Sequence, residues 1–420
     1  MKSVSTLGLA ALLASGAVVV TAAPAVAQDK KAKPAKANFS PAFLKAAQPA
    51  QAALKADPAT AEPAVAAAEA AASTDDDKYQ VGLMRVQVEQ AKLRSSPTGD
   101  SQVLRAPLEA LLANPKTTPE QRANFGAVLG RLAYQRKDYA SAVTIWTQAQ
   151  QAGSADAELP NLIRQARLLS GDTAGAAASY EAAITAAEAK GQKAAELDYR
   201  VAIDAYQKSK QGPQAIAALR RWVAAYPTTK NWRDALYIFG LQRGSLATLD
   251  RAQTIDVFRL LRQTRSLDGY AYAEYAQKVV DTGLPDEGKA VLSEGIASGQ
   301  VQRNPTINAL VAQTERQIGL QGSLAPLETK AQSAANGNLA YQTGDAYLGQ
   351  KNYAKAVALY RTALQKGGVD ANLVNTHLGI ALALSGDKAG ARTAFEAVKG
   401  GTRADIAQFW IVWLDHPATA

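Results

Sequence analysis

The chain has 420 residues, of which 47% are apolar and 20% charged, and these proportions exclude a chain that is disordered throughout. It contains no cysteine, which excludes a disulfide framework, a thiol nucleophile and a cysteine-based zinc site. The formal net charge of +9 is small for this length and favours solubility, or contact with an anionic envelope polymer or lipid head groups.

The N-terminus has the pattern of a secretory signal peptide. Lys2 precedes an uncharged apolar stretch, Leu7 to Ala23, and Ala25-Val26-Ala27 has the small-x-small form that signal peptidase cleaves. We expect cleavage after Ala27; the alternative is an uncleaved membrane anchor, since the stretch approaches spanning length. No cysteine follows the cleavage site and no later stretch is apolar enough to span a bilayer. The sequence therefore predicts a periplasmic protein that is not a lipoprotein, has no transmembrane segment after cleavage and does not bind nucleic acid.

The residues after the signal peptide change character twice. Residues 28–39 form a Lys/Ala/Pro run that we expect to be a flexible tether. From Ser40-Pro41, which suits a helix cap and first turn, residues 40–116 alternate helical spacing with short breaks and predict N-terminal helical hairpins. The acidic cluster Asp75-Asp76-Asp77 precedes one of these helices. The helix dipole explains it, and no calcium-loop pattern follows.

A pattern of small and aromatic residues recurs along the chain. It is clearest in residues 336–400, where each residue of one copy lies 35 positions before its counterpart in the next, and three further copies occupy residues 117–228. The two clearest copies consist of Gly344, Tyr347, Tyr353, Ala356, Tyr360 and Ala363, followed by Gly379, Leu382, Lys388, Ala391, Phe395 and Val398. In period and residue type the chain resembles the tetratricopeptide-repeat (TPR) family, as an exported bacterial member.

This resemblance implies an all-α, right-handed superhelical solenoid of antiparallel helix hairpins. Small residues would lie where the two helices of a hairpin cross, and the first helices would line a concave groove. Residues 229–335 would form divergent helical repeats, and residues 401–420 a C-terminal capping helix and tail. Some members of the family hold a chaperone's C-terminal carboxylate with Lys and Asn in the groove, and that pattern is absent from the matching positions here.

The divergent region carries the candidate partner-binding residues. Four arginines recur along Leu249 to Arg265 and predict either a surface for an acidic partner or head groups, or a solvated helix face. The nearby tyrosines suit either stacking on sugars or packing between helices, and Tyr341 is an outward position of a clear repeat. The candidate residues are Arg251, Arg259, Arg262, Arg265, Tyr270, Tyr272 and Tyr341.

No pattern predicts a catalytic, metal or cofactor site. The two histidines, His377 and His416, have no partner at a metal-ligand spacing, and there is no G-x-S-x-G elbow. The pairs Gly367-Gly368 and Gly400-Gly401 follow repeat helices and suit helix C-caps. The leading hypothesis is a non-enzymatic periplasmic scaffold or adaptor for protein partners. The alternatives are a binding module associated with envelope polysaccharide or peptidoglycan, and an enzyme with an unrecognised site.

Overall fold

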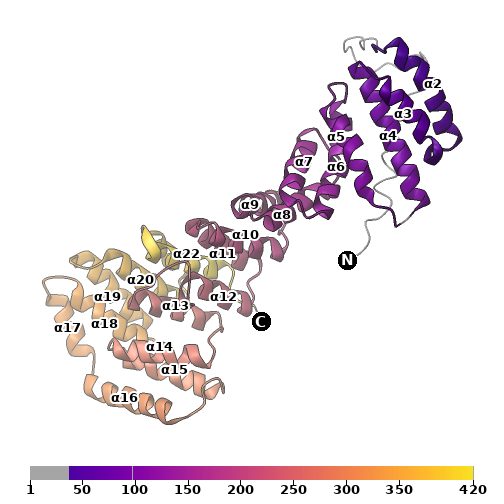
Figure 1. Ribbon diagram of the computed structural model, residues 1–420. Helices are drawn as coiled ribbons and strands as arrows, with labels where there is room; N and C mark the ends of the chain where they lie inside the picture. Colours follow the sequence, from indigo (N-terminus) through magenta and orange to yellow (C-terminus); the bar gives the residue numbers. More distant parts are fainter. Residues whose placement is uncertain (1–36, 97, 420) are drawn as a thin grey trace. The chain divides into compact units, whose positions relative to one another are not determined.

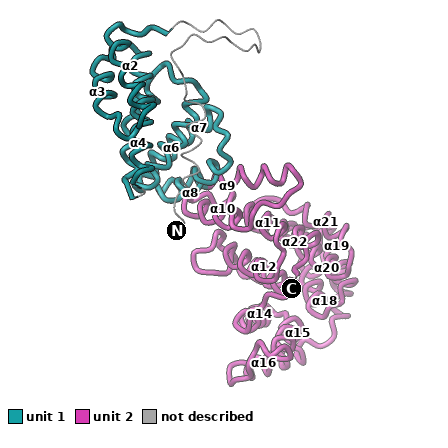
Figure 2. Tube along the Cα trace, turned by 90° about the vertical axis from the view of Figure 1, so that its right-hand side faces the viewer, with its two compact units in different colours: residues 1–176 teal, residues 177–420 magenta. Residues whose placement is uncertain are grey.

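The computed structural model describes residues 37–96 and 98–419 (Figure 1). The expected signal peptide, residues 1–27, and most of the expected tether lie outside the described residues. The described chain is all-α, and its only extended pairing is an isolated bridge between Thr228 and Thr419. None of the described helices combines the length and the apolar character needed to cross a membrane. The chain divides into two compact units, residues 1–176 (unit 1) and 177–420 (unit 2) (Figure 2).

Unit 1 is a succession of helices packed on their neighbours in sequence. Thr74 and Thr118 begin two of them with capping boxes, in which each threonine side chain accepts from a backbone N–H one turn into the helix. The helices are α2 (Pro41–Ala56), α3 (Glu62–Ala70), α4 (Asp75–Ser95), α5 (Arg105–Ala113), α6 (Pro119–Gln135), α7 (Tyr139–Gln151), α8 (Leu159–Ser170) and the start of α9 (Thr173–Glu188).

The expected contact of a glycine with an aromatic ring forms where the helices of a hairpin cross. Gly130 of α6 faces the fully buried Trp146 of α7, and a Cβ at Gly130 would lie 2.3 Å from the indole. The indole N–H donates to the Ala127 carbonyl at 3.1 Å. In unit 2, Gly344 meets Tyr360 and Gly379 meets Phe395 in the same way. These crossings confirm an all-α solenoid of antiparallel, TPR-like hairpins.

Unit 2 contains the remaining helices. Its most closely packed hairpins are α10/α11, α14/α15, α18/α19 and α20/α21. α12 runs directly into a π-helical turn, Tyr237–Leu241. The helices are α10 (Glu196–Lys208), α11 (Gly212–Ala225), α12 (Thr229–Leu236), α13 (Arg251–Gln263), α14 (Gly269–Asp281), α15 (Pro285–Ala297), α16 (Pro305–Gln321), α17 (Ala325–Ser333), α18 (Asn338–Gly349), α19 (Tyr353–Lys366), α20 (Ala371–Ser385), α21 (Lys388–Glu396) and α22 (Gly401–Asp415).

The last helix, α22, packs on two parts of unit 2. Trp410 stacks on Phe395 of α21 with ring centroids 5.9 Å apart, so the helix covers the last hairpin. Asp405 accepts from Arg220 of α11 at 2.8 Å. After the helix, the Thr419 N–H donates to the Pro227 carbonyl at 2.7 Å. The end of unit 2 is therefore packed against α11 as well as α21. Figures 1 and 2 both show α11 beside α22, and Figure 2 also labels α21 near them.

Candidate partner-binding site

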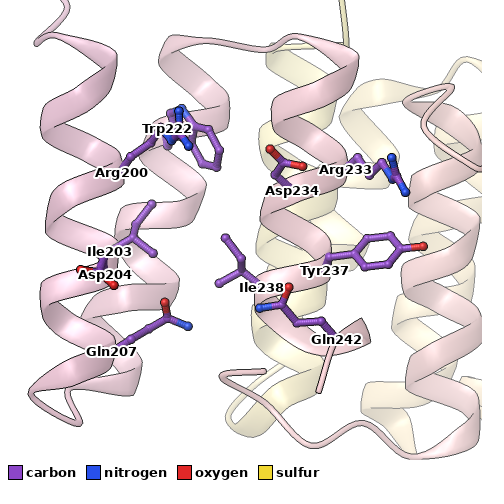
Figure 3. A pocket seen from close by; sticks show the side chains of 10 residues that line it. All are labelled: Arg200, Ile203, Asp204, Gln207, Trp222, Arg233, Asp234, Tyr237, Ile238 and Gln242. Carbon is purple, nitrogen blue, oxygen red and sulfur yellow. The ribbon is translucent and has the colours of Figure 1, made fainter. Parts of the chain in front are cut away.

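A hollow of about 550 Å³ opens between α10 and α12 in unit 2 (Figure 3). α10 is the first helix of its hairpin and α12 follows that hairpin, so the hollow lies where the repeat architecture places its groove. Arg200 and Asp204 of α10 line it. The lining residues are Arg200, Ile203, Asp204, Gln207, Trp222, Arg233, Asp234, Tyr237, Ile238 and Gln242.

The floor of the hollow is apolar and fixed in place. Ile203 and Trp222 are buried. The Trp222 indole N–H donates to a Glu196 carboxylate oxygen at 3.1 Å, and the Asn231 amide donates to the same oxygen at 2.8 Å. The Trp222 and Asn231 side chains of this region therefore have their hydrogen-bond partner within unit 2.

The rim of the hollow is polar, and most of its charges are already paired. Asp204 accepts from Lys208 at 2.7 Å, and Asp234 accepts from Lys230 at 2.5 Å. Arg233 pairs with Asp268. Arg200 is exposed and makes no ion pair or hydrogen bond through its side chain within the described residues. The hollow therefore presents one free guanidinium above an apolar floor.

The π-helical turn shapes the second wall. Gly240 is close to the Leu249 side chain, and a Cβ at Gly240 would lie 2.5 Å from it. The Arg233 guanidinium lies 5.3 Å from the centre of the Tyr237 ring, a cation–π arrangement. Burial and the nearby Asp268 carboxylate raise the pKa of Tyr237, with Arg233 opposing them. Single π turns within helices occur frequently at functional sites.

The structure places the four candidate arginines in different surroundings. Arg251 is exposed in the first turn of α13 and Arg265 is exposed just after the helix, whereas Arg262 pairs with Glu294 at 2.7 Å. Arg259 is only 3% exposed and donates to both carboxylate oxygens of Glu287, at 2.9 and 2.8 Å. Both predictions for these arginines, a partner surface and a solvated face, are therefore wrong for Arg259, because its side chain is buried and held by Glu287 of α15.

The three candidate tyrosines also differ in exposure and surroundings. Tyr270 is 74% exposed. Tyr272 is buried between α14 and α15, and its hydroxyl donates to Glu294 at 2.9 Å. Tyr341 lines a second hollow, of about 430 Å³, with its ring centroid 5.6 Å from that of His377. Of the three, Tyr270 is therefore the most accessible to a ligand.

A buried network of charged side chains, which sequence reasoning missed, lies at the centre of unit 2. His377 of α20 bridges two carboxylates: its Nδ1 lies 2.6 Å from Asp345 of α18, and its Nε2 lies 3.1 Å from Asp256 of α13. Arg403 of α22 donates to the other oxygen of Asp256 at 2.9 Å. The network comprises Asp256, Arg259, Glu287, Asp345, His377 and Arg403, and two buried hydroxyls join it, from Tyr275 to Glu287 and from Tyr360 to Asp345.

The charges of this network balance only when the histidine is protonated. Burial by itself would lower the pKa of His377, but the flanking carboxylates of Asp345 and Asp256 outweigh it and raise the pKa to about 9. The pKa of Asp256 is in turn held below its usual range: burial would raise it, and the His377 imidazolium together with the Arg259 and Arg403 guanidiniums outweighs that effect. Three cations then face three carboxylates. Within the described residues, no group of three or more His, Asp or Glu side chains is arranged to hold a metal ion.

Comparison with known proteins identifies no family. No family model matches the chain, and no curated protein is similar to it. Among the solved structures that match is a chain of "Structure of Naa15/Naa10 bound to HypK-THB", with 11% sequence identity and a TM-score of 0.29. The alignment covers 84% of the present chain and 63% of that one. A similarity at this level supports no functional argument, so the function has to be argued from the hairpins and hollows themselves.

Proposed function

We propose that this protein is a non-enzymatic scaffold that binds a protein partner through the groove of unit 2. The observation that carries the proposal is the hollow between α10 and α12, whose floor is held rigid by internal hydrogen bonds (Figure 3). A surface that is already ordered loses little conformational entropy on binding, so more of the contact energy appears as affinity.

The chemistry of the hollow suits a peptide segment or a helix of a partner. Ile203 and Trp222 offer an apolar floor to one partner side chain, while Arg200, Gln207 and Gln242 offer donors at the rim. Tyrosine, tryptophan and arginine are the residue types that dominate binding energy in protein interfaces. Glycan binding is less well supported than protein binding. A sugar-stacking site built from these tyrosines would rest on one accessible ring, that of Tyr270.

The proposed compartment is the periplasm, and it rests on the signal-peptide pattern that ends at Ala27. Fractionation of cells that express the full chain with a C-terminal tag tests it, together with N-terminal sequencing of the product. A mature chain that begins at Gln28 in the periplasmic fraction is the expected result. A full-length chain in any other fraction would contradict it.

Site-specific photo-crosslinking in whole cells tests the scaffold function. A photoreactive amino acid at Gln207 or Gln242 should give discrete protein adducts, identified by mass spectrometry. The same substitution at Gln214, which is exposed on α11 outside the hollow, should not. Arg200→Glu should reduce the adducts at least fivefold without changing the melting temperature, because Arg200 has no partner within the described part of the unit. Equal yields at all three positions, or adducts with glycan alone, would refute the scaffold function.

A further inference from the structure

A second face of unit 2 carries a pocket with an excess of positive charge. It has a volume of about 420 Å³ and lies where α13 and α18 end. Three of the four candidate arginines line it together with one lysine, opposite two glutamates. We call it the basic pocket, and its charged residues are Arg259, Arg262, Arg265, Lys351, Glu287 and Glu294.

Only half of these cations are neutralised inside the protein. Arg259 is held by Glu287 and Arg262 by Glu294. Arg265 and Lys351 are exposed, and neither makes an ion pair or a side-chain hydrogen bond within the part of the chain that the structure describes. Two cations with no ion-pair partner among the described residues therefore line one pocket.

The backbone at these two cations is unusual. Arg265 has φ of 56° and Lys351 has φ of 60°, in the left-handed region where a side chain is disfavoured. Each is the second residue after its helix, and Gly283 takes the same place after α14. At both positions a cation therefore stands where glycine would fit the backbone better.

The helix dipole alone does not distinguish these two residues. Among residues 37–96 and 98–419, the non-glycine residues with positive φ are four cations, and Lys137 and Lys210 stand at the same position after α6 and α10. A cation at a helix C-terminus is favoured in all four cases. Arg265 and Lys351 differ because they line one pocket, whereas Lys137 and Lys210 line none of the hollows described here.

We propose that the basic pocket binds a carboxylate side chain, from Asp or Glu, of the protein partner. The pocket's buried arginine already holds a carboxylate in this way, because Arg259 donates two hydrogen bonds to Glu287. The pocket also has an apolar part, beside the polar Gln263: Leu348 is buried, and Leu384 and Tyr353 are half-buried. A partner segment with an acidic residue next to an apolar one would match both the free cations and the apolar side chains of the pocket. The inference rests on the proposed function and names the chemistry that the partner presents.

Peptide binding to the full-length protein tests the assignment. Fluorescence anisotropy would compare a labelled Glu-Leu-Glu-Leu peptide with its glutamine and phosphoserine counterparts. The glutamate peptide should bind at least tenfold more tightly than the glutamine peptide. The double variant Arg265→Gln/Lys351→Gln should lose at least tenfold in affinity. The matched control, Lys137→Gln/Lys210→Gln, removes the same charge from the same backbone positions and should leave the affinity unchanged.

Four outcomes would overturn the inference. Equal binding of the glutamate and glutamine peptides would mean that the pocket does not recognise a carboxylate. An equal loss in both double variants would mean that net charge alone is responsible. An unchanged affinity in the Arg265/Lys351 double variant would mean that the peptide binds elsewhere. Tenfold preference for the phosphoserine peptide would assign the pocket to phosphate instead.

The crosslinking test of the proposed function and the peptide-binding test of this inference have independent outcomes. Adducts formed at Gln207 and Gln242 report on the α10/α12 hollow, which shares no lining residue with the basic pocket. If those adducts persist while the glutamate peptide shows no specific binding, only the carboxylate assignment is overturned.

Discussion

The two units bury charge in different ways. In unit 1, the buried Asp77 accepts from backbone N–H groups. Those of Ser73 and Thr74, at the start of its own helix α4, lie at 3.0 and 3.1 Å, and that of Ser40, just before α2, lies at 3.0 Å. In unit 2, the buried carboxylates of Asp256 and Asp345 take their partners from other helices, through His377 and the arginines. The first arrangement needs only the N-terminal ends of two helices, α2 and α4. The second arrangement exists only when five helices are in place, so its loss should destabilise all of unit 2.

The largest effect is expected from breaking the network in unit 2. Asp256→Ala would leave His377, Arg259 and Arg403 with too few carboxylates in a buried site, and removing one partner of a buried pair typically costs about 3–5 kcal/mol. Hydrogen exchange measured by mass spectrometry should show faster exchange in α13, α18, α20 and α22.

A matched control sharpens this comparison. Asp204→Ala also removes a carboxylate of unit 2, but its ion pair with Lys208 is exposed on both sides and should contribute at most about 1 kcal/mol. Exchange in α6 and α7 of unit 1 should be unchanged in both variants. Equal exchange in α20 for Asp256→Ala and the wild type would show that the network does not stabilise unit 2.

The next effect is a difference in pH dependence between the units. The pKa of His377 is raised from 6.5 to about 9, so its contribution is fully present below pH 6.5 and is lost as the pH rises through 9. This shift corresponds to roughly 3 kcal/mol at 1.4 kcal/mol per pKa unit. Thermal unfolding followed between pH 6 and 10 should show the loss in unit 2. His377→Gln should flatten the profile, and an unflattened profile would assign the effect to another group.

Unit 1 should respond at the opposite end of the pH scale. Burial would raise the pKa of Asp77, but hydrogen bonds from Ser73, Thr74 and Ser40 lower it from 3.8 to about 2. This stabilisation is present above pH 3.8 and is lost as the pH falls through 2. Exchange in α2 and α4 should therefore rise in acid. Asp77→Asn should remove that dependence. Asp75→Asn should keep it, because the Asp75 carboxylate makes no hydrogen bond with the residues that the structure describes.

The sequence predicts contacts within one hairpin better than contacts between helices that lie far apart in the chain. The glycine–aromatic crossings were predictable because Gly130 and Trp146 belong to one hairpin and recur with the period of the repeat. His377 was not assigned a partner, because Asp345 lies in the preceding hairpin and Asp256 comes from α13, more than a hundred residues earlier. Arg259 was placed on a surface because its spacing to Arg262 defines a helix face but does not say what covers it.

The predicted hairpins can be tested at their crossings. Gly130→Ala would place a Cβ 2.3 Å from Trp146, and overpacking of this kind typically costs about 1–3 kcal/mol. Gly319→Ala is the matched control, since this glycine lies within α16 with no atom near its added Cβ, and it should gain about 0.5–1 kcal/mol of stability. The measurement is urea denaturation followed by circular dichroism. A neutral Gly130→Ala variant would show that the crossing tolerates a methyl group.

The smallest expected effect separates stability from binding within unit 2. Arg265→Gly relieves a left-handed backbone conformation that a side chain disfavours, so we expect a gain of about 0.5–1 kcal/mol in unfolding free energy. The same variant removes one of the two free cations of the basic pocket and should weaken binding of the Glu-Leu-Glu-Leu peptide several-fold. Lys210→Gly should give the stability gain without the loss of binding, because Lys210 lies outside the pocket. If Arg265→Gly destabilised the protein instead, Arg265 would make a structural contact that outweighs the cost of its backbone conformation, and stability and binding would not be separable at this position.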